Sequence, residues 1–445
     1  MLKIACFFLV IATTTPLWSQ VEPAANGGGF DLDDSRMMTP PPVSGDAYPV
    51  VVGSESRSNY IGAGLIFTAA HTDNLLIGGE TRATGDQIYS FLPSFNFDRR
   101  TPRQGESLHY SAGFDLYQDK DPLSGVNQDA TADYRFHVSP YTVLDFHDEL
   151  RQNNNLFNQG NPFAGGGVSG SPGSNGVLIA PFENQLSNMA SAGIEYQYAR
   201  NAMIGGRLSD AFLQFSSSSN SQGLNNGNTA GGTAFYNRRI ARSQYVGVTY
   251  QFSKFITHPI DTYTVTNTVL GFYTHYFTRS FSFSILGGPE HYTSWYSSTP
   301  KQGSWTPAVQ GSFGWQALRT NIAVSFSHIV SGASGSGLIG TYNADLVALN
   351  GRFAFARRWS TGANAEYALL NPVSGTPKLF GFGTGGHTVS GGVNLQHTIT
   401  ESLYAEGGYA YFHESYPNNP GVSLFPSSNR EYISINYGFR RPLGR

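Results

Sequence analysis

Apolar and polar side chains alternate along most of the chain, from about residue 60 to the end. In residues 245–252 the even positions carry Val, Val, Tyr and Phe, whereas the odd positions carry Tyr, Gly, Thr and Gln. Residues 108–116 and 281–285 repeat this pattern. Because successive side chains of a β-strand point to opposite faces, the alternation predicts strands with one apolar and one polar face.

The strands recur in pairs, each pair joined by a short polar turn and followed by a longer segment rich in Gly, Asn, Ser and Pro. The short turns centre near Arg100, Pro140, Arg200, Ala241, Thr278, Leu318, Arg357 and Thr400. Strands of about a dozen residues exceed those of a soluble β-sandwich and match the length that a tilted membrane-spanning strand needs. A β-propeller would pack four short strands into the same repeat. The pattern therefore predicts an all-β fold, a closed antiparallel transmembrane β-barrel with short periplasmic turns and longer extracellular loops.

Eighteen strands fit the alternation, and an even count is typical of single-chain bacterial barrels. Their expected ranges are 60–71, 86–98, 106–118, 128–138, 140–151, 187–198, 202–214, 229–239, 243–255, 263–276, 279–292, 304–315, 318–330, 344–355, 358–370, 387–398, 401–413 and 429–441. The weakest alternation lies in 60–71 and 229–239, so sixteen strands is the alternative count.

The first 57 residues precede the alternating pattern. Residues 1–19 combine a basic start, a short apolar core and a polar end with small residues, which predicts a secretory signal peptide. Residues 20–57 have no periodicity and predict a disordered periplasmic leader, so the barrel is expected over residues 58–445. The sole cysteine, Cys6, lies in the predicted signal peptide, and the mature chain should therefore contain no disulfide.

The composition supports a membrane barrel over a soluble domain. Charged residues make up only 13% of the chain and aromatic residues 14%. A soluble protein needs more charge, whereas a barrel needs an apolar outer band and aromatic girdles. The net charge of −3 argues against nucleic acid as a partner.

The last predicted strand carries Ile433, Ile435, Tyr437 and Phe439 on one face. In this feature the chain resembles bacterial outer-membrane β-barrels, whose last strand is read by the barrel-assembly machinery. One departure is that residues 440–445 follow the terminal aromatic residue. The closing Arg-Pro-Leu-Gly-Arg and the Gly-Gly-Pro-Glu segment at 287–290 resemble uncharacterised, porin-like barrel proteins of acidobacterial type. The resemblance implies a Gram-negative outer-membrane location, with membrane lipid and the assembly machinery as partners, and no particular activity.

Charged side chains concentrate in the two strands around Pro140. We expect nine side chains on the face that lines the lumen: Asp133, Arg135, His137, Asp145, His147, Glu149, Glu195, Arg207 and Glu366. Such a group either selects ions at a constriction or braces the wall as a ladder of salt bridges. The sequence leaves both interpretations open.

No residue pattern predicts a catalytic, cofactor or metal site. Asp145, His147 and nearby serines form no recognisable catalytic set, because such a set is defined by geometry. The histidines are scattered without ligand spacing, and Asp115, Asp119 and Asp121 are more simply a solvated loop. We therefore expect no enzyme activity.

These features together favour an outer-membrane channel that lets small polar solutes diffuse past a wall of Ser, Thr, Asn and Gln. One alternative is a barrel plugged by its loops that acts in adhesion or envelope organisation, and another is an outer-membrane hydrolase. The long segment 152–186 either enters the lumen or stays outside, and nothing in the sequence indicates the solute or the oligomeric state.

Overall fold

The computed structural model describes residues 59–75, 85–119, 125–153, 184–215, 224–258, 261–278, 280–296, 300–333, 335–336, 340–373, 385–415 and 427–443. The predicted signal peptide and leader lie outside these residues, as does most of the segment 152–186. All regular structure in the described residues is β-strand. No helix in this part of the chain is long and apolar enough to cross a membrane.

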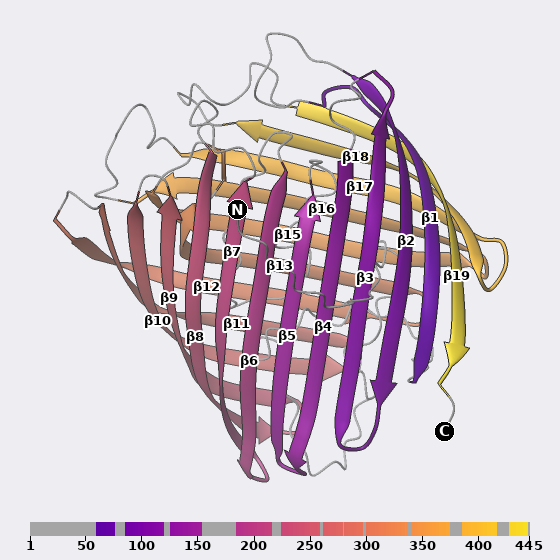
Figure 1. Ribbon diagram of the computed structural model, residues 1–445. Coiled ribbons are helices and arrows are strands. Elements are labelled where there is room, and N and C mark those ends of the chain that lie inside the picture. Colours follow the sequence, from indigo (N-terminus) through magenta and orange to yellow (C-terminus); the bar gives the residue numbers. More distant parts are fainter. Residues whose placement is uncertain are drawn as a thin grey trace, which may run out of the picture.

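Nineteen strands form one sheet (Figure 1). They are β1 (Tyr60–Thr72), β2 (Asp86–Arg100), β3 (Gln104–Tyr117), β4 (Gly125–Ser139), β5 (Thr142–Asn153), β6 (Gln185–Ala199), β7 (Ala202–Phe215), β8 (Leu224–Ala241), β9 (Gln244–His258), β10 (Thr262–Thr278), β11 (Phe281–Tyr296), β12 (Gln302–Gln316), β13 (Thr320–Ala333), β14 (Gly335–Ser336), β15 (Gly340–Ala356), β16 (Trp359–Pro372), β17 (Gly386–Thr398), β18 (Leu403–Ser415) and β19 (Ser427–Pro442).

The sheet closes into a barrel because its last strand pairs with its first. β19 runs antiparallel to β1 from Pro442 opposite Tyr60 to Arg430 opposite Thr72. All strands except the two-residue β14 are long, so the wall has eighteen strands, and the alternative of sixteen is wrong. Both strands with weak alternation are present, as β1 and β8. The predicted fold class is thus confirmed.

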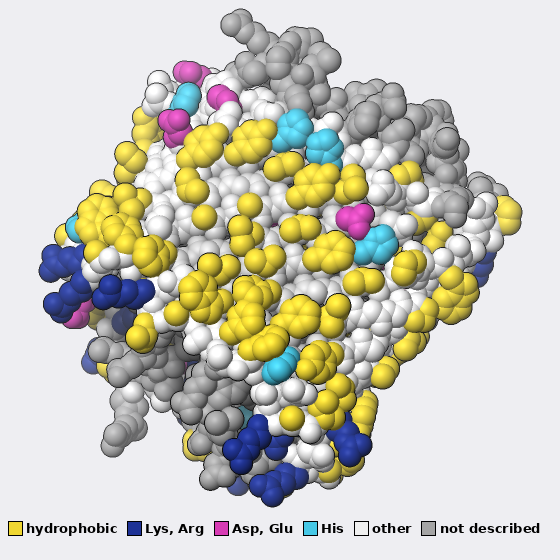
Figure 2. Space-filling model, turned by 180° about the vertical axis from the view of Figure 1, so that it is seen from behind, with side chains coloured by type: hydrophobic (Ala, Val, Ile, Leu, Met, Phe, Trp, Pro, Cys, Tyr) yellow, Lys and Arg dark blue, Asp and Glu magenta, His cyan; other side chains and the backbone are white. Residues whose placement is uncertain are grey.

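Outward positions carry the apolar side chains. On β19, Ile433, Ile435, Tyr437 and Phe439 are between 51% and 69% exposed, and they alternate with inward Ser434 and Asn436, which are buried. Figure 2 shows apolar side chains spread over the wall opposite to the one that faces the viewer in Figure 1. This is the apolar outer band that a membrane barrel requires.

The two rims of the barrel differ. The turns of two to four residues at the short-turn rim carry exposed arginines such as Arg319, Arg357 and Arg358. Figure 2 shows Lys and Arg side chains gathered near the lower edge of the barrel. Just above them, Phe281 packs against Phe277 and Phe313 with ring centroids 4.9 and 4.7 Å apart. The opposite end, the long-loop rim, is where the longer connections leave the strands. Apolar rings next to charged turns are typical of a membrane–water interface.

The interior is narrowed because the end of β13 leaves the wall. β13 pairs with β12 only up to His328, opposite Val309. Beyond that point the backbone N–H of Val330 donates to Glu290 Oε2 on the inner face of β11, at 2.9 Å. A second contact joins β15 to the inner face of β10, where the hydroxyl oxygens of Thr264 and Thr341 lie 2.6 Å apart. β14 then pairs with the start of β8. The segment β13–β15 thus crosses the inner side of the arc formed by β8 to β12.

Apolar side chains fill the space under this crossing. Leu270, Phe272, Leu286 and Ala308 point inward from β10, β11 and β12 and are at most 4% exposed, with Ile329 of β13 packed against them. These apolar residues interrupt the expected wall of Ser, Thr, Asn and Gln, although inward Thr266, Thr274 and Ser312 on the same arc are polar. The segment β13–β15 and the wall of β8 to β12 can meet here because their facing side chains are small or apolar, and a contact that excludes water must be closely packed.

Candidate functional site

The inner face of β4 to β7 carries a charged surface, which we call the charged wall. On β4 and β5 the even-numbered side chains include Tyr134, Val138, Phe146 and Leu150, which are 37–56% exposed on the outer surface. The odd-numbered side chains therefore point to the inside of the barrel. This places the six predicted charges of β4 and β5 together on the inner face: Asp133, Arg135, His137, Asp145, His147 and Glu149.

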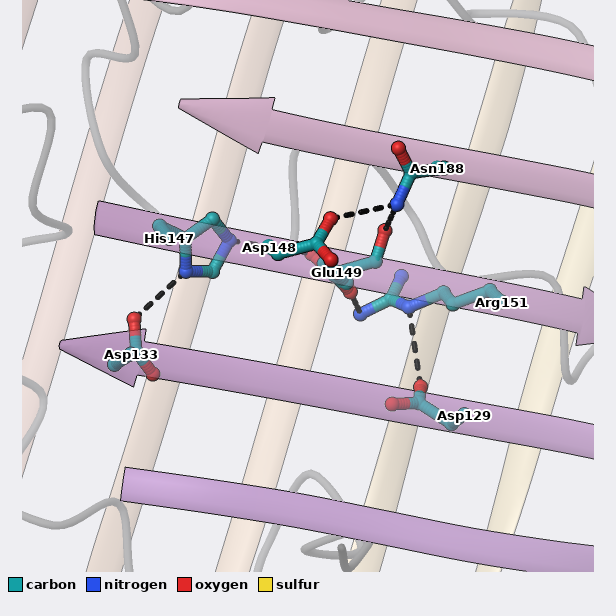
Figure 3. A network of polar contacts seen from close by, with 7 residues as sticks. All are labelled: Asp129, Asp133, His147, Asp148, Glu149, Arg151 and Asn188. Atoms are coloured by element: carbon teal, nitrogen blue, oxygen red, sulfur yellow. Dashed lines mark hydrogen bonds and ion pairs between the residues drawn. The ribbon is translucent and has the colours of Figure 1, made fainter. Parts of the chain in front are cut away.

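His147 joins two of the carboxylates, those of Asp133 and Glu149. Its Nδ1 lies 2.7 Å from Asp133 Oδ1 across the β4–β5 pair (Figure 3). Its Nε2 lies 3.9 Å from Glu149 Oε2 on the same strand. One imidazole thus links a carboxylate of β4 with a carboxylate of β5.

The wall continues toward the long-loop rim through Arg151. Its guanidinium group forms ion pairs with Glu149 and with Asp129, the latter at 3.1 Å (Figure 3). The sequence analysis missed Asp129 and Arg151. Both occupy odd positions inside the predicted strands 128–138 and 140–151, so the same alternation would have found them.

The second part of the wall spans three strands. Arg207 Nη2 on β7 lies 2.8 Å from Asp145 Oδ2 on β5, although β6 runs between them. The residue of β6 in the same row is Gly193, which pairs with Asp145 on one side and Arg207 on the other. A Cβ atom on Gly193 would lie only 2.5 Å from Asp145 Oδ1. The glycine therefore leaves the room through which the two charges meet.

The other predicted charges are less closely grouped. Arg135 lies directly opposite Asp145 in the β4–β5 register. Glu195 lies on the inner face of β6, two residues from Gly193. Glu366 belongs to β16, between Ala348 of β15 and Ser390 of β17, and is not part of the charged wall. Eight of the nine predicted charges therefore share one region, and Glu366 is the exception.

The charged wall faces water inside the barrel. The side chain of Asp133 is 54% exposed although it points inward. Inward polar residues on the opposite arc, such as Thr274, Ser284 and Gln310, are at most 2% exposed. The open part of the interior therefore lies along β4 to β7, while the β9–β13 side is filled.

The described residues contain no group of three His, Cys, Asp or Glu side chains that could hold a metal ion. Asp115, expected in a solvated loop, is instead buried on β3, where it accepts hydrogen bonds from Ser90 and Asn127 on neighbouring strands. Asp121, expected in the same loop, lies outside the described residues. The wall thus offers fixed charges in water, which is suited to binding or repelling ions.

No protein-family model and no curated protein sequence matches the chain. Among solved structures, it is similar to OccAB2 of Acinetobacter baumannii, with 11% identity, 87% of this chain and 100% of that chain covered, and a TM-score of 0.41. It is also similar to OpdK of Pseudomonas aeruginosa, solved with vanillate, with 9% identity, 86% and 99% coverage and a TM-score of 0.40. For OccK2 (OpdF) of the same organism the values are 9%, 86%, 98% and 0.42. These similarities are too low to carry an argument about function.

Proposed function

We propose that this protein is a channel of the bacterial outer membrane through which small polar solutes diffuse without catalysis. Its support is a closed barrel with an apolar outer surface and an interior that is hydrated on one side. The exposure of the inward carboxylate of Asp133 carries the proposal, because a group that points into a filled barrel would be buried. Eighteen strands enclose a space wide enough for an aqueous path.

The charged wall would then set which ions pass. Five carboxylates, those of Asp129, Asp133, Asp145, Glu149 and Glu195, stand against three guanidinium groups on the same wall. With neutral histidines the wall carries net negative charge, and we infer a weak preference for cations. A fixed charge beside a narrow path favours ions of the opposite sign. Salt bridges within the wall reduce this preference without cancelling it.

The test is the conductance of the refolded mature protein in a planar lipid bilayer. The expected result is stable, stepwise current with a reversal potential that indicates cation preference in a salt gradient. Asp133→Asn, which removes the most exposed carboxylate, should shift that potential toward zero. Glu366→Gln is the matched control on the far wall and should change it less. Folded protein that carries no current would overturn the proposal.

The filled arc of β9 to β13 favours a second candidate. If the rest of the interior is closed as well, the protein is a plugged barrel that acts in adhesion or envelope organisation. Folded protein without current would support this candidate. A barrel hydrolase has no such observation in its favour.

Three earlier expectations remain proposals. They are export through the signal peptide of residues 1–19, recognition of the last strand by the barrel-assembly machinery, and kinship with acidobacterial-type barrels. An N-terminal sequence of the mature protein that begins near residue 20 would support the first. Loss of assembly in Phe439→Ala would support the second.

A further inference from the structure

The outer face of β5 to β9 carries charged and small side chains in one continuous row. Strand register places Asp148 opposite Ala190, Ala190 opposite Asp210, Asp210 opposite Ala230, and Ala230 opposite Lys254. Charged residues thus alternate with alanines across five neighbouring strands. We call these five residues the outer row.

All five residues are on outward positions. Asp148 lies between outward Phe146 and Leu150, which are 47% and 41% exposed. Leu208, two residues before Asp210, is 71% exposed, and Tyr250 precedes Lys254 on the outer face of β9 at 43%. Asp148, Asp210 and Ala230 are themselves exposed. The row therefore faces what surrounds the barrel rather than its interior.

The row is at the depth of the membrane. Asp148 is the seventh residue of β5, counted from the short turn at Thr142. A tilted strand rises about 2.5 Å per residue along the barrel axis, so Asp148 lies roughly 15 Å above that turn. The apolar band of such barrels is about 25 Å tall. Asp148 is thus near the middle of the band. The row rises toward Lys254, the eleventh residue of β9, which lies roughly 25 Å above its turn and hence at the upper edge of the band.

Beside Lys254, the outer face of β10 to β12 carries aromatic rings together with polar side chains such as Asn267 and Thr293. On β10 and β11, Tyr263 and Trp295 stack with ring centroids 5.3 Å apart, and Trp305 of β12 is 69% exposed. The wall seen in Figure 2 carries many apolar side chains, interspersed with polar ones and several His side chains. It does carry one outward ion pair, His328 with Asp345, but these two groups satisfy one another at 2.6 Å.

The charges of the outer row are not satisfied in the same way. Asp148 Oδ1 accepts a hydrogen bond from Asn188 Nδ2 at 2.7 Å (Figure 3). Asp210 and Lys254 make no hydrogen bond or ion pair that links them to another described residue. An unpaired charge on the lipid face destabilises a barrel in a depth-dependent way. A surface that carries three charges therefore fits a protein partner better than lipid.

We propose that the outer row is an interface between copies of this chain in the membrane. All copies point the same way through the membrane, so in a closed ring the left flank of one barrel meets the right flank of the next. The β9 flank carries Lys254, and the β5–β7 flank carries Asp148 and Asp210. Of the two carboxylates, Asp210 is nearer in height to Lys254, so these two opposite charges meet between copies, and the intervening alanines let the two walls approach closely.

The first test is disulfide cross-linking between copies. Ala190→Cys and Lys254→Cys are combined in a chain whose only natural cysteine has been replaced by Cys6→Ser. Within one barrel the two positions are three strands apart, about 14 Å, whereas a disulfide needs Cα atoms within about 7 Å. A covalent bond can therefore form only between copies. Ala363→Cys with Ile433→Cys, also three strands apart on another part of the wall, is the control.

Oxidation of outer membranes that contain the folded variants should give dimers and larger products for Ala190→Cys/Lys254→Cys. Their yield should exceed that of the control pair at least tenfold. Equal yields for both pairs would show that random collision produces the cross-links. Monomers alone for both pairs would show that the copies do not meet at the outer row. Either result would overturn the proposal.

The second test measures the oligomeric state by native mass spectrometry in mild detergent. Ala230→Trp should convert the assembly to monomers, whereas Ala365→Trp on β16 should not. Asp210→Lys should weaken association about tenfold, and Asp210→Lys/Lys254→Asp should restore it. Heat-modified mobility on gels verifies that each variant is folded. A wild-type protein that is monomeric and folded at all concentrations would overturn the interface.

Discussion

Gly193→Ala should break the Asp145–Arg207 ion pair without touching either charge. The added Cβ would lie 2.5 Å from Asp145 Oδ1 and 2.8 Å from Oδ2, both closer than real Cβ contacts allow. The carboxylate must therefore rotate away, and the 2.8 Å contact with Arg207 is lost. Both side chains are largely buried, at 14% and 27% exposure, so the loss should cost about 1–2 kcal/mol.

A second effect of the substitution has the opposite sign. Replacing Gly by Ala within a strand reduces the freedom of the unfolded chain, which stabilises the fold by about 0.5–1 kcal/mol. Gly438→Ala on β19 isolates this effect, because a Cβ there meets nothing within 4 Å. Gly193→Ala should therefore be about 1–2 kcal/mol less stable than Gly438→Ala, although it can be close to the wild type.

The assay is urea unfolding in lipid vesicles, followed by the fluorescence of Trp295, Trp305, Trp315 and Trp359. The measurement is repeated in an Arg207→Gln background, where the ion pair is already absent. There the difference between the two glycine variants should shrink to within about 0.5 kcal/mol. Equal stability of Gly193→Ala and Gly438→Ala in the natural background would refute the role assigned to Gly193.

Three further outcomes follow from the interior contacts. Arg151→Gln removes the cation beside Glu149 and Asp129. One charge about 10 Å from an ion in water is worth about 0.4 kcal/mol, so the cation preference in bilayer recordings should rise about twofold. An unchanged reversal potential would contradict the inference that the charged wall faces the ion path. Ile329→Ala removes the β13 side chain from the inner apolar cluster and should lower the free energy of unfolding by about 2–4 kcal/mol, whereas exposed Ile433→Ala should lower it by much less; similar losses would contradict the packing. Thr264→Val deletes the hydroxyl contact with Thr341 and should lower the free energy of unfolding by about 1 kcal/mol in the same urea assay. The same substitution should have no such effect in a Thr341→Val background.

Much of the fold was predictable because the signal for a membrane strand is local. Alternation in residues 243–255 predicted β9, which the structure bounds at Gln244–His258. The short polar turns fixed which strands are neighbours. The grouping of Asp133 with His147 followed as well, because two strands joined by a two-residue turn have a defined register.

The rest depends on contacts between segments that are distant in sequence. Nothing in the alternation of β13 indicates that Val330 bonds to Glu290, forty residues earlier. Alternation places Leu286 and Ile329 on the inner face, where an apolar side chain has no evident partner until the crossing of β13 is known. The role of Gly193 likewise follows only from the register of three strands, because glycine occurs in strands for many different reasons. Sequence patterns give the strands and their faces, but not how far a barrel narrows.

The pairing of β1 with β19 has a consequence for how the protein is made. Tyr60 and Pro442 lie opposite each other although 382 positions separate them in the chain, the difference of their numbers. This contact has the largest sequence separation in the sheet, and closing so long a loop carries a high entropic cost. A chain truncated before residue 427 can form neighbouring hairpins but not the final seam. Completion of the barrel is thus tied to arrival of its last sixteen-residue strand, which makes the C-terminus a checkpoint for the integrity of the whole chain.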